Sequence, residues 1–166
     1  MARIDSMSEP ERHTDRPLPP YRFLPGRGIH PTRDPAGHSY GLPPPAPATL
    51  SAADWRSNAD FLYAVDLFNH RFWWEAHEVF EGLWHASGRR TPVGHCLQAL
   101  IQCAAVHLQV ELSHRRGAQS LLRRARRHAA AAGEATLGLD LAAVLADTAG
   151  FAADPQGPAA QLKLAG

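Results

Sequence analysis

The prolines of this chain are concentrated at one end, and that asymmetry limits where regular structure can form. Eleven of the 14 prolines lie before residue 48. Proline fixes φ and lacks a backbone N–H, so such a segment cannot continue as a helix or pair fully in a sheet. The sequence therefore predicts a proline-rich extended segment over residues 1–50. Aromatic and aliphatic residues within 21–40 leave two alternatives open: a disordered tail, or a segment pinned to a folded surface.

From residue 51 the sequence changes to helical periodicity, with apolar residues recurring at intervals of three and four. Ser51 and Asp54 are spaced as a helix-capping pair. No alternating pattern of period two competes. The predicted fold class is all-α: a compact bundle of about four to five helices over residues 51–150, followed by a C-terminal tail over 151–166. The expected helices span about residues 54–69, 72–86, 92–113, 116–133 and 139–149.

Charge and composition exclude several classes of protein. With 17 basic and 16 acidic residues the net charge is +1, so no overall field favours nucleic acid or an acidic membrane. No uninterrupted apolar run approaches the ~18 residues of a membrane helix. The first 20 residues also lack the apolar core of a signal peptide, so a cytoplasmic location is expected. Cys96 and Cys103 are seven residues apart in one expected helix, too far for a disulfide, and are predicted to be buried thiols.

The helix expected over residues 72–86 carries the strongest candidate site. His77, Glu78 and Glu81 gather on one side of it together with His85. His77 and Glu81 are one turn apart and can converge on one cation, and an imidazole with carboxylates suits a divalent metal ion. We therefore predict His77 and Glu81 as metal ligands and Glu78 as a catalytic base acting on bound water. The alternative is a solvated face whose glutamates pair with arginines.

The zincin protease motif is close to this segment but incomplete. Residues 77–81 read H-E-x-x-E, whereas the zincin motif is H-E-x-x-H. Glu81 stands where the second zinc-binding histidine belongs, which argues against a zincin protease.

Tryptophans beside these carboxylates need cover from water, which predicts that another segment lies over the helix. The proline-rich residues 30–40 are the expected cover, because a proline-restricted backbone loses little entropy on docking. Together with glutamines of the following helix they would close a small polar pocket. The predicted ligand-binding residues are Glu75, Trp74, Trp84, Gln98, Gln102, His30 and His38.

Three segments resemble a known family. Residues 68–84 read FNHRFWWEAHEVFEGLW, residues 97–102 read LQALIQ, and residues 117–122 read GAQSLL. In order and spacing they are similar to domain of unknown function family 309, whose pattern is an E-A-H-E-x-x-E-x-x-W helix, a Q-G-L-I-Q helix and a G-A-x-x-L-L helix. The resemblance covers about residues 54–145, and the proline-rich lead is similar to an extension in many bacterial members. It implies a small bacterial helical bundle with no assigned activity.

Three functions remain open at this point, and neither the substrate nor the presence of enzyme activity follows from the sequence. The favoured one is a protein that binds a metal ion or a small ligand, with hydrolysis as one activity of such a site. A second is a non-catalytic module for a protein partner or a homodimer, because exposed tryptophan and arginine are common interface anchors. Nucleic-acid binding through the arginine-rich helix over 116–133 is the least favoured, because that helix has no interleaved aromatic residues.

Overall fold

A computed structural model of the chain describes residues 8–166, and this part is all-α, as predicted. Residues 1–7 of the expected extended segment lie outside the described residues. A short 3-10 helix, η1, precedes five α-helices, and the described part has no strand beyond two isolated bridges. The elements are η1 (Trp55–Ser57), α1 (Ala59–Asn69), α2 (Trp73–Ser87), α3 (Pro92–Glu111), α4 (Arg115–Ala132) and α5 (Leu141–Ala153).

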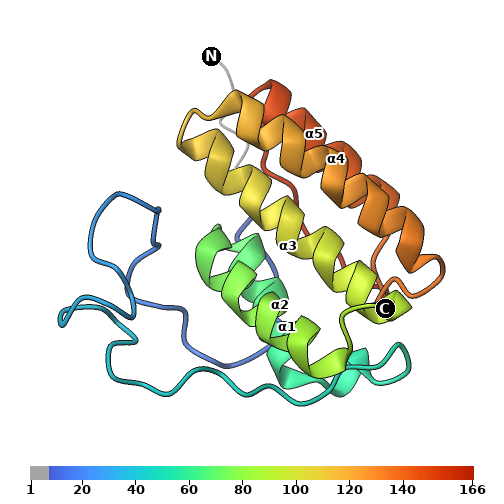
Figure 1. Cartoon of the computed structure of the whole chain (residues 1–166), viewed down its shortest axis with the longest axis horizontal. Coiled ribbons are helices and arrows are strands. Elements are labelled where there is room, and N and C mark those ends of the chain that lie inside the picture. Colours follow the sequence, from blue (N-terminus) through green and yellow to red (C-terminus); the bar gives the residue numbers. More distant parts are fainter. Residues whose placement is uncertain (1–7) are drawn as a thin grey trace.

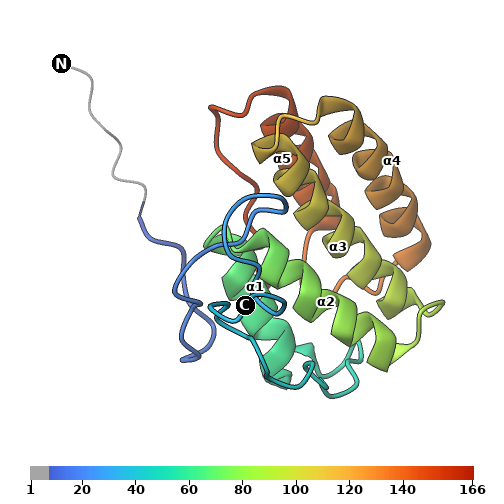
Figure 2. The same ribbon diagram turned by 60° about the vertical axis from the view of Figure 1, so that its left-hand side comes forward.

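The helices surround α3. Helix α2 packs on one side of it and α4 on another, α5 contacts both α3 and α4, and α1 packs against α2. Figures 1 and 2 show that the N-terminal segment runs along the α1 and α2 side of the bundle, away from α4. The outer surface of α2 is therefore the one that this segment can cover.

Helix α3 is, among the described residues, the one helix long and apolar enough to cross a membrane by length and composition, but 61% of its apolar window is buried inside the bundle. That burial is typical of a core helix. Its Cys96 and Cys103 are free and buried, as predicted. Burial raises the pKa of Cys96 to about 12 and that of Cys103 to about 11, so both thiols are unreactive.

The first α-helix begins later than the sequence predicted. The Asn58 side chain accepts a hydrogen bond from the Phe61 N–H at 2.9 Å and caps α1, the role expected of Ser51 and Asp54. Those two residues instead close a turn, in which the Ser51 N–H donates to Asp54 Oδ1 at 2.8 Å. The expected helix over 54–69 is thus divided into η1 and α1.

The N-terminal segment is anchored by a buried carboxylate. Asp66 on α1 is fully buried and accepts hydrogen bonds from the His13 N–H at 2.7 Å, the Thr14 N–H at 2.9 Å and the Thr14 hydroxyl at 2.7 Å. Arg12 Nε lies 3.2 Å from the same carboxylate. These contacts hold residues 12–14 against α1.

Residues after α5, for which the sequence predicts a C-terminal tail, pack against the core. Leu162 is buried, and its backbone exchanges two hydrogen bonds with the Asn69 side chain, at 2.7 and 3.0 Å. The Ala160 N–H donates to Nε2 of buried His107 at 3.2 Å. Helical periodicity stops at Ala153, and the sequence pattern does not predict the contacts of the irregular segment that follows.

Candidate functional site

Helix α2 presents two different surfaces. Its apolar side chains, among them Trp73, Ala76 and Phe80, are buried against the bundle. Its polar side chains divide between a half-exposed cluster, which we call the His77 cluster (His77, Glu78 and Glu81), and the buried Glu75 one turn earlier.

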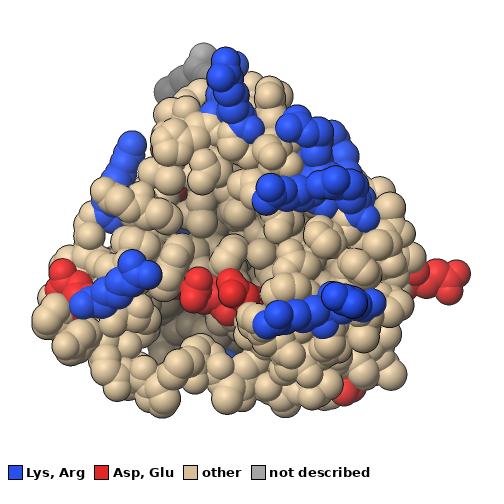
Figure 3. All heavy atoms as spheres, viewed as in Figure 1, with Lys and Arg blue, Asp and Glu red and all other residues tan. Residues whose placement is uncertain are grey.

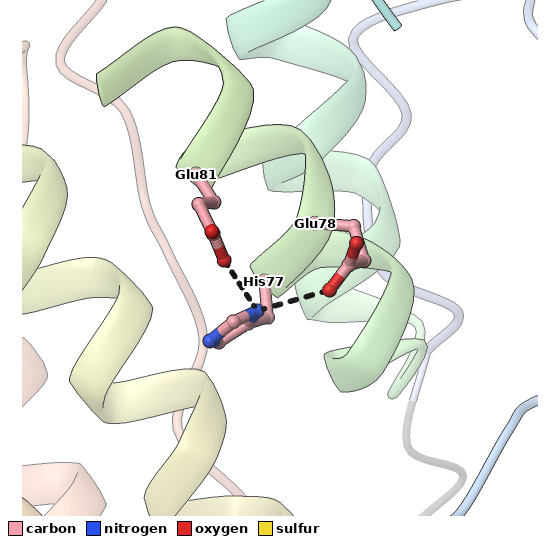
Figure 4. A group of neighbouring side chains, drawn as sticks. All are labelled: His77, Glu78 and Glu81. Carbon is pink, nitrogen blue, oxygen red and sulfur yellow. Dashed lines mark ion pairs between the residues drawn. The ribbon is translucent and has the colours of Figure 1, made fainter. Parts of the chain in front are cut away.

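The His77 cluster is an open group of potential metal ligands on a single helix. His77 Nδ1 lies 3.5 Å from Glu78 Oε1 and 3.7 Å from Glu81 Oε2, and Figure 4 shows the ring between the two carboxylates. One ligand atom from each residue falls within 4.8 Å of the others. The glutamate side chains are 47% and 44% exposed, so water would complete the coordination of any bound ion.

The alternative, in which these glutamates pair with arginines, is not found among the described residues. In the part of the chain that the structure describes, the ion-pair partners of Glu78 and Glu81 are histidines of α2, including His85 at 3.6 Å from Glu81. The cluster therefore keeps an acidic character that cations from other helices do not neutralise.

Glu75 is held under the N-terminal segment. Its Oε1 accepts a hydrogen bond from the Phe23 N–H at 3.1 Å and lies 3.5 Å from His38 Nε2. Its Oε2 is buried and has no hydrogen-bond partner. Burial raises the pKa of Glu75 above its usual value, although the hydrogen bonds from Phe23 and His38 act in the opposite direction.

Aromatic rings fix the segment against the start of α2. Phe23 meets Trp74 edge-on with ring centroids 5.1 Å apart, and His30 contacts the same indole at 5.6 Å. Tyr21 packs on His38 at 4.8 Å, and its hydroxyl accepts the His38 backbone N–H at 3.2 Å. An aromatic pair such as Phe23 with Trp74 stabilises by about 0.5–1.5 kcal/mol beyond burial of its area. The predicted docking of residues 30–40 on α2 is therefore confirmed.

Between the N-terminal segment and helices α1 and α2 lies an open groove of about 750 Å³, which we call the segment groove. Figure 3 shows a hollow with acidic side chains at its rim in this part of the molecule. Prolines and other apolar residues dominate the lining, and Glu75 and Glu78 contribute carboxylates. The groove is lined by Pro17, Leu18, Pro19, Pro20, Thr32, His38, Ser39, Leu42, Pro43, Pro44, Pro45, Tyr63, Leu67, Trp74, Glu75, Glu78 and Val79.

The structure gathers some of the predicted ligand-binding residues and leaves others apart. Glu75, Trp74 and His38 line the groove, and His30 packs on Trp74 from the side. The other three are not in the lining: Trp84 donates its indole N–H to the Arg89 carbonyl at 3.2 Å, and Gln102 donates to Gln98 at 3.1 Å.

Sequence reasoning missed several lining residues. Tyr63 is on α1, and Leu42 with the prolines 43–45 belongs to the segment. The exposure of Leu42, at 65%, is visible only in the structure. No periodic pattern connects these residues with α2, because their proximity depends on how the segment crosses two helices.

One comparison with known proteins bears on this region. Residues 61–121 match the family model of a domain of unknown function, DUF309. This stretch of the chain is similar to the DUF309 family. This DUF309 match runs from α1 into α4, so it confirms the resemblance and includes the His77 cluster, whereas most of the segment groove's N-terminal wall lies outside it. No curated protein and no solved structure matches the chain.

Proposed function

We propose that this protein binds a small organic molecule in the segment groove. Glu75 carries the proposal: it is a buried carboxylate that lines the groove and has one oxygen without a hydrogen-bond partner. A buried polar atom that lacks a partner costs free energy, and a ligand N–H or O–H can remove that cost. Small-molecule sites typically combine an apolar concave surface with a few polar groups of this kind.

The experiment is a chemical-shift titration of ¹⁵N-labelled protein with neutral, cationic and anionic aromatic fragments. Binding in the groove is expected to shift the Trp74 indole signal and backbone signals of residues 38–45 and 75–79. Leu42→Asp should weaken binding, because it places a charge in the apolar lining. Tyr40→Asp is the matched control, since Tyr40 is 52% exposed and outside the lining.

Two results would contradict the proposal. One is that no fragment shifts these signals at concentrations up to about 10 mM, near the weak end of measurable affinity. The other is that self-association, rather than fragment binding, is lost in Leu42→Asp, which would favour the interaction module instead.

Divalent metal binding by the His77 cluster is the second candidate function, and the 4.8 Å grouping of its ligand atoms favours it. His77 and Glu81 would hold the ion, and Glu78 would be placed as a base toward water bound to it. Calorimetric titration with Zn²⁺ or Mn²⁺ tests this, and His77→Ala should abolish the binding. His114→Ala is the control, because His114 is exposed at the start of α4. Equal binding by wild type and His77→Ala would refute the site.

A further inference from the structure

The lining of the segment groove contains carboxylates but no lysine or arginine among the described residues. Among the described lining residues the ionisable side chains are Glu75, Glu78, His38 and Tyr63, and no lysine or arginine is present. Glu75 and Glu78 are three residues apart on α2 and so project from one face of the helix. Glu78 is half-exposed at the rim, while Glu75 is 6% exposed beneath the segment. A groove of this kind attracts cations and repels anions.

An arginine near the groove is already occupied. Arg16 lies over the Tyr63 ring at 5.3 Å and pairs with Asp60 at 2.8 Å. It does not line the groove. Among the described residues, the ion-pair partners of the two groove glutamates are histidines, His38 for Glu75 and His77 for Glu78, and not arginines.

The uncharged part of the lining suits the body of an organic cation. The indole of Trp74 and the ring of Tyr63 are surfaces on which a cation is stabilised electrostatically. Prolines 43–45 and Leu42 offer apolar surface beside them. A small hydrated metal ion would gain nothing from such surface, whereas an amine with an apolar substituent contacts both parts.

We infer that the ligand of the segment groove is a protonated amine with an apolar substituent. Its N–H groups donate to the Glu75 and Glu78 carboxylates, and its apolar part lies against Trp74 and the prolines. The inference rests on the proposed function and specifies the chemical class of the molecule bound. A second observation does not depend on net charge: Glu75 is more than nine-tenths buried, and its Oε2 has no hydrogen-bond partner. This supports a ligand that donates hydrogen bonds.

The test compares three probes of one shape: benzylamine, benzyl alcohol and benzoate, titrated into the full chain at pH 7. Benzylamine is expected to bind at least about tenfold more tightly than the other two, since a hydrogen bond to a charged group contributes about 1.5–3 kcal/mol and 1.4 kcal/mol is tenfold. Glu75→Gln should weaken benzylamine binding by about tenfold. Glu78→Gln, a change at the half-exposed rim, should also weaken benzylamine binding. This second variant tests the inference if Glu75→Gln does not fold.

Glu134→Gln is the control, because Glu134 is exposed and outside the groove lining. It should change benzylamine affinity less than about twofold, as expected for a screened charge. If benzyl alcohol binds as tightly as benzylamine, the inferred class is wrong and the proposed function stands. If none of the three probes binds, both fail. If Glu81→Gln weakens benzylamine binding and the groove variants do not, the amine is held by the His77 cluster and the inference is overturned.

Discussion

Two buried polar side chains hold the two ends of the described chain against the bundle. Asp66 on α1 binds residues 12–14, and His107 on α3 accepts the backbone N–H of Ala160. Each is completely shielded from solvent. A buried polar group stabilises a fold only while its partners stay in place, so these two residues connect side-chain chemistry with the docking of the termini.

Removing the charge of Asp66 should release the N-terminal anchor. Burial works against ionisation of Asp66, but the hydrogen bonds from His13, Thr14 and Arg12 outweigh it and hold its pKa below the usual value. In Asp66→Asn an amide NH₂ would face N–H donors, so we expect a loss of about 2–4 kcal/mol in the free energy of unfolding. Urea unfolding measures it. Asp60→Asn, which removes a partly exposed ion pair, should cost less than about 1 kcal/mol. Equal costs would contradict the anchor.

His107 makes stability depend on pH. Its Nδ1 lies 2.8 Å from the Cys103 carbonyl oxygen and its Nε2 accepts from Ala160, so the neutral ring donates once and accepts once. Burial, with a smaller effect of the Arg71 charge, lowers the pKa of His107 from 6.5 to about 4. Below pH 6.5 the unfolded chain takes up a proton that the folded protein does not accept until about pH 4. The free energy of unfolding therefore falls as the pH falls through this window, by up to about 3 kcal/mol from this residue.

The measurement is urea unfolding at pH 7 and pH 5 for the wild type, His107→Gln and the exposed control His114→Gln. Glutamine can both donate and accept but does not titrate. We expect a smaller pH dependence in His107→Gln and an unchanged one in the control. Identical pH dependence in all three proteins would show that His107 is not the titrating group.

At the residue scale the sequence was informative about α2 and silent about its partners. The spacing of His77, Glu78 and Glu81 predicted a cluster correctly, because side chains one turn apart on a helix must be neighbours. The contact between Phe23 and Glu75 joins residues 52 apart through the backbone of an irregular segment. No helical period encodes such a contact.

Helix α4 has small buried residues on one side and exposed arginines on the other. Small buried residues, among them Ala118 and Ala125, let α3 approach it, and its arginines are exposed. Within the described residues no ion pair involves an arginine of this helix. The helix therefore depends on its alanines for packing, whereas its charges contribute little to stability.

Two variants of α4 should differ in their effect on the free energy of unfolding. Ala125→Leu adds volume at a position that is 0% exposed, and overpacking of this kind costs about 1–3 kcal/mol. Changing Arg123 and Arg127 together to Gln should alter the free energy of unfolding by less than about 0.5 kcal/mol, as for ordinary surface changes. Thermal and urea unfolding of both variants measures these changes in the free energy of unfolding. A large loss in the arginine variant would mean that these charges have buried partners.

At the element scale the five helices could be predicted because each has an apolar side that repeats with the helical period. Their ends were harder to predict, since a cap is a single hydrogen bond: Asn58 rather than Asp54 begins α1. The segment after α5 could not be predicted at all. Its contacts depend on single side chains, Asn69 and His107, that meet its backbone in the core.

For the whole molecule, the bundle is bordered by two irregular segments that complete it. The N-terminal segment covers α1 and the start of α2, as Figure 2 shows, and supplies one wall of the groove. The C-terminal segment pairs with the turn before α5, where the Ala165 N–H donates to the Gly138 carbonyl at 2.7 Å. Folding of the bundle and formation of the groove are therefore coupled through chain that is not helical.

The contacts of residues 12–17 bear on an expectation from the sequence. Residues before Tyr21 have no helical periodicity, which predicts that removing residues 1–20 leaves folding intact. In the structure, residues 12–14 provide the partners of Asp66, and the Pro17 carbonyl accepts the Tyr63 hydroxyl at 2.9 Å. We expect the free energy of unfolding of a chain that starts at Tyr21 to be lower by about 3–5 kcal/mol, because the buried charge of Asp66 is left without its partners.

A double-mutant cycle distinguishes loss of the Asp66 contacts from general loss of covering chain. In the full chain Asp66→Asn should be destabilising. In the chain that starts at Tyr21 the same substitution should be neutral or stabilising, because it removes a buried charge that no longer has N–H partners. The coupling between truncation and substitution, obtained from urea unfolding of the four proteins, is expected to be about 2 kcal/mol or more. If the two effects add within about 0.5 kcal/mol, Asp66 does not connect the N-terminal segment to the stability of the bundle.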